Sequence, residues 1–388
     1  VLTPMADDAN RPFPFIANDS LNIAVHLKDD EKNEHDYATV RVPNIFKRLV
    51  KLPDSDNSFI LLENIIKEFI GKLFDGYEVV KESACFRATR DMDLDVAERD
   101  TSDFLLSVQK QLKDREHGKV VRLEIEKGMS EKLRRRLFKK LDVDKEEVYE
   151  ISGPIDLTFL KKLYGAVKDH DELRYKPFKA YVDPALDLSS DIFANIRKQD
   201  YLVQHPYDSF DAVLNFIKKA AHDDKVLAIK MTLYRVSGNS PIIKYLGEAA
   251  QAGKQVTVLV EVKARFDEQN NVHWAITLEQ MGCHVIYGLK GLKTHTKITL
   301  VIRRDEDGIR RYLHLGTGNY NDVTAHFYTD MGLFTCQREL GIDATNLFNM
   351  LSGYSRPPYF RQLRISPEHI REFINQKIDR EIEIAKAG

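Results

Sequence analysis

The stretch GLKGLKTHTKITLVI, residues 288–302, places a segment rich in glycine, lysine and threonine directly before an apolar run. The apolar residues from Ile298 to Ile302 predict a buried strand. Because strand side chains repeat every two residues, we expect His295 and Lys297 to lie on one face at the beginning of this strand. An imidazole beside an ammonium group suits a site that holds an anion next to a nucleophile. The same pair also fits a solvated surface, so its neighbours must decide.

The next strand ends in a second polar group. Residues 311–315 follow a predicted turn at residues 305–308, so the two strands form a hairpin, and the sequence HLGTGNYN continues from His314 to Asn321. Two glycines let the backbone approach a ligand closely, and exposed loop amides can cradle an oxyanion. His314 and Asn319 are therefore candidate site residues.

Upstream of this hairpin, helical and strand patterns alternate. Helices are predicted over residues 209–222, 241–252 and 272–281, and strands over residues 226–234, 255–262 and 284–287. A further strand and helix follow at residues 332–335 and 344–351. This alternation is typical of an α/β layer with helices on both faces of a largely parallel sheet. We therefore predict the α/β fold class, with an α+β domain upstream.

Two arginines stand where strands of that sheet end. Arg235 follows the strand at residues 226–234, and Arg265 follows the strand at residues 255–262. The carboxyl ends of strands in an α/β sheet line the ligand crevice, and a planar guanidinium group binds phosphate oxygens in pairs. Ser240 and Pro241 have the pattern of a helix N-terminus, which attracts anions. Together these features predict phosphate binding.

The first part of the chain has a different pattern, and we predict three domains. Residues 1–181 form a mixed α/β domain, residues 182–362 a domain of alternating strands and helices, and residues 363–388 the beginning of a third. In the middle domain, strands are predicted at residues 21–27, 39–42, 57–62, 77–89 and 120–125, and helices at residues 63–73, 100–112 and 130–141. The basic run at residues 134–140 fits a solvated helix face, with a dimer contact as an alternative.

The composition excludes several classes of protein. The 388 residues include 58 basic and 60 acidic side chains, a formal net charge of -2, so nothing global favours nucleic acid. No run approaches the roughly 20 apolar residues of a membrane helix, and no secretory signal is visible. Three scattered cysteines argue against structural zinc and favour a cytoplasmic location, with peripheral membrane attachment left open. Because the chain begins with Val1, we expect a processed or excised piece.

The ordered motifs from residue 201 to residue 358 resemble the first catalytic domain of polyphosphate kinases of the long bacterial type, which have a phospholipase-D-like fold. FRATRDMDLD at residues 86–95 and VVRLEIE at residues 120–126 resemble the upstream domain of that family. The other matching stretches are HPYDSFD (205–211), TLYR (232–235), SGNSPI (237–242), AGKQVTVLVEVKARFDEQNN (252–271), GLKTHTK (291–297), YLHLGTGNYN (312–321), YTDMGLFT (328–335) and GYSRPP (353–358).

The resemblance implies an enzyme that reversibly transfers the γ-phosphate of ATP to inorganic polyphosphate through a phosphohistidine. His295 matches the nucleophile of the family's KTHxK motif, and imidazole suits this role because it is largely neutral near pH 7. His314 and Lys297 would support it. Tyr328 matches the family's ATP contact, and we assign Asp330 as the group that orients the imidazole.

The resemblance also implies magnesium, because the family's metal site matches Arg235 and Arg265. A guanidinium group cannot ligate a cation, so we expect both arginines, with Asn319, to bind phosphate oxygens of a magnesium–nucleotide complex. The implied cofactor is Mg²⁺, and the implied partners are ATP or ADP, polyphosphate and further copies of the chain in a homo-oligomer. Neither nucleic acid nor a transmembrane segment is implied.

Two other functions stay open at this point. Ordinary phosphodiesterases and nucleases of the phospholipase-D-like superfamily have an acid after the HxK pair in the same strand, where this sequence has Ile302. A non-enzymatic polyanion-binding scaffold would explain the arginines but not the HxK pair. The resemblance makes residues 1–181 the family's middle domain of the dimerisation type, residues 182–362 its first phospholipase-D-like catalytic domain, and residues 363–388 the start of a truncated second catalytic domain. It also makes a polyphosphate track an alternative for the basic run at residues 134–140. Because members of the family have a further helical domain and a complete second catalytic domain, we expect this piece alone to be inactive or impaired.

Overall fold

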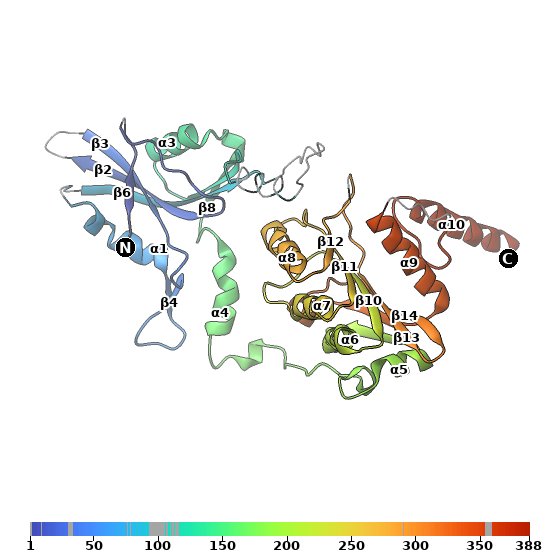
Figure 1. Cartoon of the computed structure of the whole chain (residues 1–388). Coiled ribbons are helices and arrows are strands. Elements are labelled where there is room, and N and C mark those ends of the chain that lie inside the picture. The colour runs from blue at the N-terminus through green and yellow to red at the C-terminus, as the bar shows by residue number, and fades with distance from the viewer. Residues whose placement is uncertain are drawn as a thin grey trace. The chain divides into compact units, whose positions relative to one another are not determined.

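The computed structural model describes residues 2–8, 10–29, 34–75, 77, 79–92, 116–289, 291–353 and 359–388, together with positions 105, 108, 110 and 112. The chain forms two compact units, one from Val1–Val96 and Lys110–Pro177 and the other from Ala97–Gln109 and Phe178–Gly388 (Figure 1). Both units combine helices with sheets, which confirms the predicted α/β class. Most of the helix predicted at residues 100–112, and most of the GYSRPP motif, lie outside the described residues. The three-domain division stays a prediction.

Unit 1 is built on one six-stranded sheet. Its order is β1 (Pro4–Ala6), β3 (Glu34–Arg41), β2 (Leu21–Asp29), β6 (Val79–Arg90), β7 (Val120–Glu126) and β8 (Val148–Ile151). Neighbours are antiparallel except for β7 and β8. Helix α3 (Glu131–Leu141) covers one face with leucines spaced four apart, and α1 (Leu62–Glu68) packs on the other. A small ribbon, β4 (Leu49–Lys51) with β5 (Phe59–Leu61), and α4 (Leu160–Ala166) complete the unit.

The basic run on α3 is largely neutralised by carboxylates of the same unit. Arg136 and Lys140 both pair with the buried Asp7, at 2.7 and 2.8 Å, and Arg134 pairs with Glu150. These contacts leave little unpaired positive charge to attract a polyanion. The role of this run, as a helix face, a polyphosphate track or a dimer contact, stays a prediction.

Unit 2 is built on a seven-stranded sheet. Its order is β12 (His284–Ile286), β11 (Gln255–Val260), β10 (Val226–Leu233), β13 (Ile298–Asp305), β14 (Gly308–Gly316), β15 (Asp330–Thr335) and β9 (Tyr201–His205). Only β12, β11 and β10 run parallel, and every other neighbouring pair is antiparallel. The prediction of a largely parallel sheet is therefore wrong. The alternating pattern locates strands but does not encode their direction, and β13, β14 and β15 follow one another without crossover helices.

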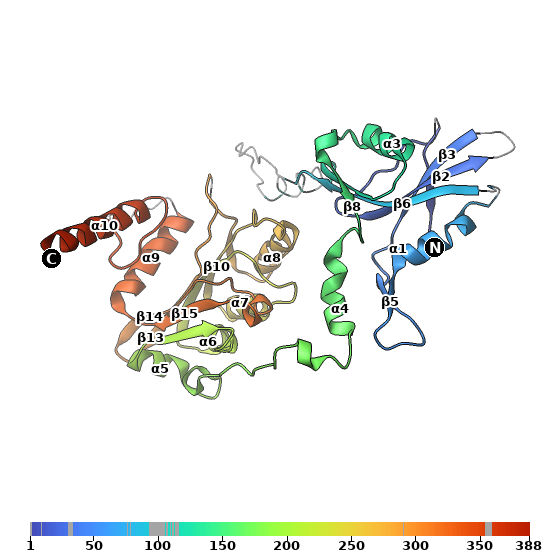
Figure 2. The ribbon, with the colours of Figure 1, turned by 180° about the vertical axis from the view of Figure 1, so that it is seen from behind.

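Helices cover both faces of this sheet, as predicted (Figures 1 and 2). On one face lie α5 (Ile192–Lys198), α6 (Asp211–His222), α7 (Pro241–Gln251) and α8 (Glu268–Gln280), and Phe216 of α6 contacts Phe334 of β15. On the other face, α9 (Arg338–Ser352) packs Leu347 and Phe348 against Leu300 and Leu313. The terminal helix α10 (Ile370–Ala387) has no buried residue.

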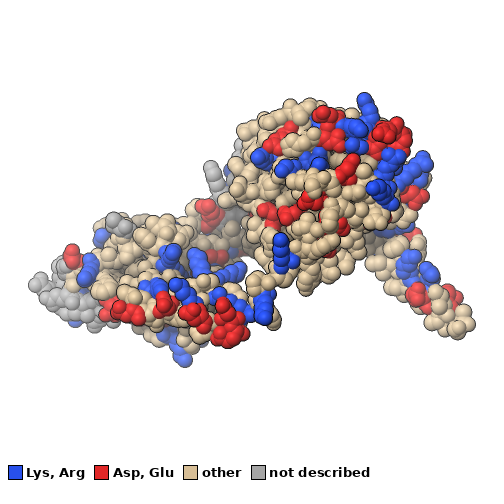
Figure 3. All heavy atoms as spheres, turned by 90° about the horizontal axis from the view of Figure 1, so that it is seen from below, with Lys and Arg blue, Asp and Glu red and all other residues tan. Residues whose placement is uncertain are grey.

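Two further features are the distribution of charged side chains on the surface and the apolarity of the helices. On the face drawn in Figure 3, basic and acidic side chains of the described residues are interspersed rather than gathered by sign. In the part of the chain that the structure describes, no helix combines the length and the apolarity needed to cross a membrane.

Candidate functional site

The predicted site residues meet at one edge of the sheet in unit 2. Strands β10 and β11 end there side by side, with Leu233 opposite Val260. Because β13 runs antiparallel to β10, it begins at the same edge, and β14 ends beside that beginning, with Ile298 opposite Leu315. The edge therefore gathers the loops that follow β10, β11 and β14 and the segment that precedes β13.

His295 and Lys297 immediately precede β13 and contact the same aromatic ring. The imidazole of His295 lies edge-on to Tyr234, with ring centroids 4.7 Å apart, and Lys297 Nζ lies 5.4 Å from the centroid of the Tyr234 ring. This arrangement agrees with the predicted common face. His295 is exposed, whereas Lys297 is buried and donates a hydrogen bond from Nζ to the carbonyl of His295. The sequence analysis missed Tyr234, although the TLYR motif contains it.

The surroundings of this pair favour a neutral imidazole. Partial burial, then the charges of Lys297 and Arg235, lower the pKa of His295 below its usual value of 6.5. Burial also lowers the pKa of Lys297, to about 8, with Asp330 opposing and Arg235 adding to that shift. Near pH 7 the site thus presents an exposed nitrogen lone pair beside a cation.

His314 lies in the core beneath the site. It is 3% exposed, and burial, with a smaller effect of His205, lowers its pKa to about 3. Its Nδ1 lies 2.9 Å from the hydroxyl of Tyr320, and its Nε2 contacts no hydrogen-bonding partner in the described chain. A side chain at position 332 would place its Cβ 2.6 Å from that Nε2, so only Gly332 fits there.

Arg235 and Arg265 lie together, but Arg235 is already paired. Its Nε lies 3.0 Å from Asp267 Oδ2, and its Nη2 donates to the carbonyl of Arg265 at 3.1 Å. Arg265 is exposed. A phosphate at Arg235 would therefore share the guanidinium group with Asp267 or displace it. The sequence analysis missed Asp267, although it follows Arg265 by two positions.

The remaining candidates surround the GTGN loop. Asn319 Oδ1 is buried and finds no hydrogen-bond partner among the described residues. Tyr328 is 60% exposed, which leaves its ring available for stacking. Asp330 accepts a hydrogen bond from Thr317 at 2.8 Å, and no hydrogen bond joins it to His295 within the described residues. Thr317 thus engages the carboxylate that we expected to orient the imidazole.

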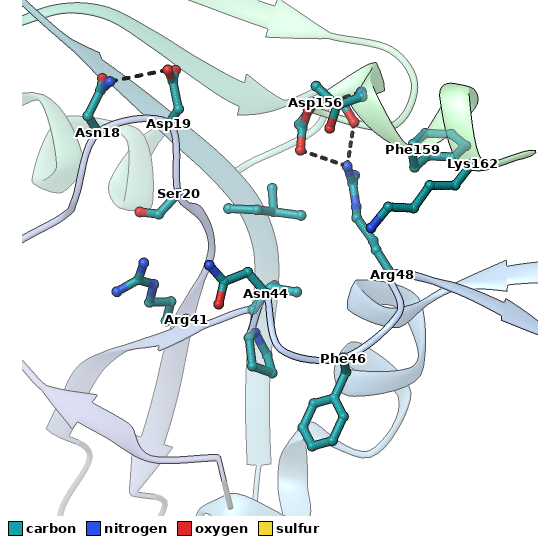
Figure 4. A pocket seen from close by; sticks show the side chains of 14 residues that line it. Asn18, Asp19, Ser20, Arg41, Asn44, Phe46, Arg48, Asp156, Phe159 and Lys162 are labelled. Atoms are coloured by element: carbon teal, nitrogen blue, oxygen red, sulfur yellow. Dashed lines mark hydrogen bonds and ion pairs between the residues drawn. The ribbon is translucent and has the colours of Figure 1, made fainter. Parts of the chain in front are cut away.

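A pocket in unit 1 has a different character from this site. It measures about 270 Å³ and is lined by charged and aromatic side chains (Figure 4). Arg48 pairs there with Glu63 at 2.6 Å and with Asp156 at 3.0 Å, and Asp19 pairs with Arg87 at 2.9 Å. These pairings hold the walls of unit 1 together, so we assign no chemistry to this pocket.

The titration of His295 tests this electrostatic description. We expect its imidazole to titrate below pH 6.5 in ¹³C-edited NMR, with the resonance assigned by its loss in His295→Ala. Lys297→Met removes a neighbouring positive charge that disfavours protonation, so the pKa of His295 should rise. An unchanged or lowered pKa in Lys297→Met would show that the two side chains do not interact as described.

Two protein-family models match the two parts of the chain. The family model described as the polyphosphate kinase middle domain matches residues 1–163, and that of polyphosphate kinase C-terminal domain 1 matches residues 191–357. The polyphosphate kinase of Lactiplantibacillus plantarum is 63% identical over 388 residues, covering 100% of this chain and 54% of that protein. That of Halalkalibacterium halodurans is 52% identical over 391 residues, covering 100% of this chain and 55% of that protein.

A solved structure shows the same likeness. The crystal structure of polyphosphate kinase from Porphyromonas gingivalis superposes with a TM-score of 0.79 at 31% identity, covering 100% of this chain and 57% of that one. The chain thus spans about half the length of the relatives that it matches.

Proposed function

The chain belongs to the polyphosphate kinase family, and we propose that it provides the phosphoryl-accepting part of an ATP–polyphosphate phosphotransferase. His295 is the acceptor in this proposal. The observation that supports it most is an exposed imidazole, kept neutral by its surroundings, at the same sheet edge as two arginines. Because the chain spans about half of its relatives, the complete reaction belongs to the longer protein.

The proposed reaction has two steps. In the first, a ring nitrogen of His295 attacks the γ-phosphorus of ATP, the bond from that phosphorus to the bridging β,γ-oxygen breaks, and ADP leaves. In the second, a terminal oxygen of polyphosphate attacks the same phosphorus, and the phosphorus–nitrogen bond breaks. The reverse sequence regenerates ATP from ADP. Two nucleophilic displacements replace one transfer between two polyanions that repel each other.

Cationic side chains lower the barrier for both steps. Arg235, Arg265 and Lys297 lie at the edge where negative charge gathers on the transferring group, and fixed charges there need no reorganisation during the reaction. The buried Lys297 keeps its charge only below its lowered pKa of about 8. The side-chain NH₂ group of Asn319 would donate to the phosphate chain. The exposed ring of Tyr328 would stack on the base of the nucleotide.

Direct magnesium ligation by Arg235 and Arg265 does not fit their chemistry, because a guanidinium group is a cation without an acceptor. The described residues also contain no group of three or more His, Cys, Asp or Glu side chains that could hold a metal ion. We therefore propose that both arginines bind phosphate oxygens.

The two remaining polar residues have secondary roles in the proposal. His314 supports the site from the core, where its burial keeps it uncharged. Asp330 tunes Lys297 by charge and holds the GTGN loop through Thr317, and it reaches the imidazole only after a local rearrangement.

We also propose a cytoplasmic homo-oligomer. Cys85, Cys283 and Cys336 are free thiols, and burial raises the pKa of Cys85 to about 12 and that of Cys283 to about 11. Unreactive thiols of this kind suit a reducing compartment. The assembly rests on the family alone, and sedimentation of the full-length protein would test it.

Substitution of the two histidines should separate their roles. In the full-length protein, His295→Ala should abolish both the labelled phosphoenzyme and polymer synthesis with γ-labelled ATP, because the acceptor nitrogen is lost. His314→Ala should weaken the reaction and still leave labelled enzyme. Peptide mapping under alkaline conditions preserves phosphohistidine and locates the label. If the label lies on the peptide that contains His314, and the His295→Ala protein is still phosphorylated, the two roles are exchanged. Release of a monoester from a phosphodiester would favour the phosphodiesterase alternative.

The arginines should each contribute strongly to turnover. Arg235→Ala or Arg265→Ala should lower phosphotransfer by the full-length protein by about 10²-fold or more, the usual scale for removing one preorganised charge. Lysine should rescue either position poorly, because a single ammonium group cannot bind two phosphate oxygens in a planar fork. Steady-state rates at saturating ATP provide the measurement. Wild-type turnover in both alanine variants would disprove the assignment.

A further inference from the structure

Glu261 is a buried carboxylate directly beneath the proposed site, and no step of the proposed reaction uses it. It follows the last residue of β11 and is 1% exposed. Its backbone N–H donates to the carbonyl of Leu233 at 2.9 Å, which continues the contact between β10 and β11 by one residue. Burying a carboxylate is costly unless it is hydrogen bonded, so its partners indicate what it does.

Both carboxylate oxygens accept hydrogen bonds from segments that lead to site residues. Oε2 accepts from the backbone N–H of Thr294 at 2.7 Å, and Thr294 directly precedes His295. Oε1 accepts from the backbone N–H of Lys263 at 3.1 Å, two positions before Arg265. The side chain of Glu261 thus connects the backbone just before His295 to the backbone just before Arg265.

Gly288 lets the chain ahead of His295 approach this carboxylate closely. It has a φ of 92°, and a Cβ built on it would lie 3.2 and 3.3 Å from the two carboxylate oxygens. A larger residue there would be strained by its backbone and would push against Glu261. The carboxylate is therefore held from both sides.

Asn271, on α8, connects the segment that contains Tyr234 and Arg235 to Glu261. It is fully buried, and its Nδ2 donates to the carbonyls of Tyr234 at 2.6 Å and of Glu261 at 2.9 Å. Tyr234 contacts the ring of His295 and precedes Arg235. Glu261 and Asn271 consequently tie together the backbones that present Arg235, Arg265 and His295.

We propose that Glu261 is a positioning residue that places His295 against Tyr234 and relative to the two arginines. The expected effect on the rate of phosphoenzyme formation rests on the proposed function. The placement of His295 by Glu261 does not depend on it. Two oxygens facing two N–H donors require the carboxylate. In a glutamine, the NH₂ group would oppose one of the two N–H groups, so one of these hydrogen bonds would be lost.

The test compares three variants of the full-length protein. Glu261→Gln keeps the shape and should lower the rate of phosphoenzyme formation by about 10²-fold, as for a reacting group displaced by about 1 Å, with the KM for ATP within about threefold. Gly288→Ala disturbs the same carboxylate without changing its charge and should give the same pattern. The matched control, Glu248→Gln, alters a carboxylate that pairs with His222 and Lys244 on the helical layer and should leave both constants unchanged.

Coupling distinguishes positioning from general loss of structure. Because Glu261→Gln and Gly288→Ala act on one contact, the double variant should be far less impaired than the product of the single effects. If Glu261→Gln fails to fold, Gly288→Ala alone tests the inference by the same split between rate and KM. Multiplicative effects, or a change in KM alone, would overturn the proposal.

A spectroscopic measurement separates this inference from the proposed function. The imidazole of His295 should titrate closer to pH 6.5 in Glu261→Gln, because the ring leaves its partly buried place beside Tyr234 and Lys297. If the wild-type protein forms no phosphohistidine and this shift still occurs, the proposed function fails and the positioning role stands. If the wild-type protein is labelled and neither rate nor titration changes in Glu261→Gln, the positioning role fails.

Discussion

The hydroxyl group of Thr232 fixes the beginning of β13 beside the end of β10, and the site depends on this junction. It donates to the carbonyl of Thr296 at 2.8 Å and accepts from the backbone N–H of Ile298 at 3.1 Å. These two bonds enclose Lys297 and leave His295 just outside the sheet. Because β10 and β11 run parallel and β13 runs against them, one edge receives His295 and both arginines.

Charge burial at this edge is tolerated because each buried ionic group has partners. Lys297 donates to a carbonyl and lies near the ring of Tyr234, and Glu261 accepts from two backbone N–H groups. Leaving one of these groups without its partner would cost about 1–3 kcal/mol, and more when the group is charged. The same burial lowers the pKa of His295, which favours the neutral imidazole that the proposed reaction needs. Structural stability and chemistry thus draw on the same contacts.

Much of the fold could be predicted from local patterns, whereas strand direction and long-range contacts could not. Helices α6 and α7 follow apolar periodicity, and Ser240 caps α7 as its sequence indicates. The hairpin of β13 and β14 was predicted, but the antiparallel pairing of β13 with β10 and of β15 with β9 joins segments far apart in the sequence, which periodicity does not encode. Among site residues, His295 and the arginines were recognisable from their motifs. Glu261 was visible only as an acid inside the apolar run VLVEV, and its partner Thr294 is 33 positions away.

We infer that buried acceptors hold the chain ahead of β13, so that His295 is placed before any substrate binds. Amide hydrogen exchange at Thr294 and Ile298 tests this claim most directly, because their N–H groups bind Glu261 and Thr232. The account predicts slow exchange at both positions without nucleotide, and selective acceleration at Thr294 in Glu261→Gln. Exchange of Thr294 in the wild-type protein at the rate of a solvent-exposed loop would contradict it.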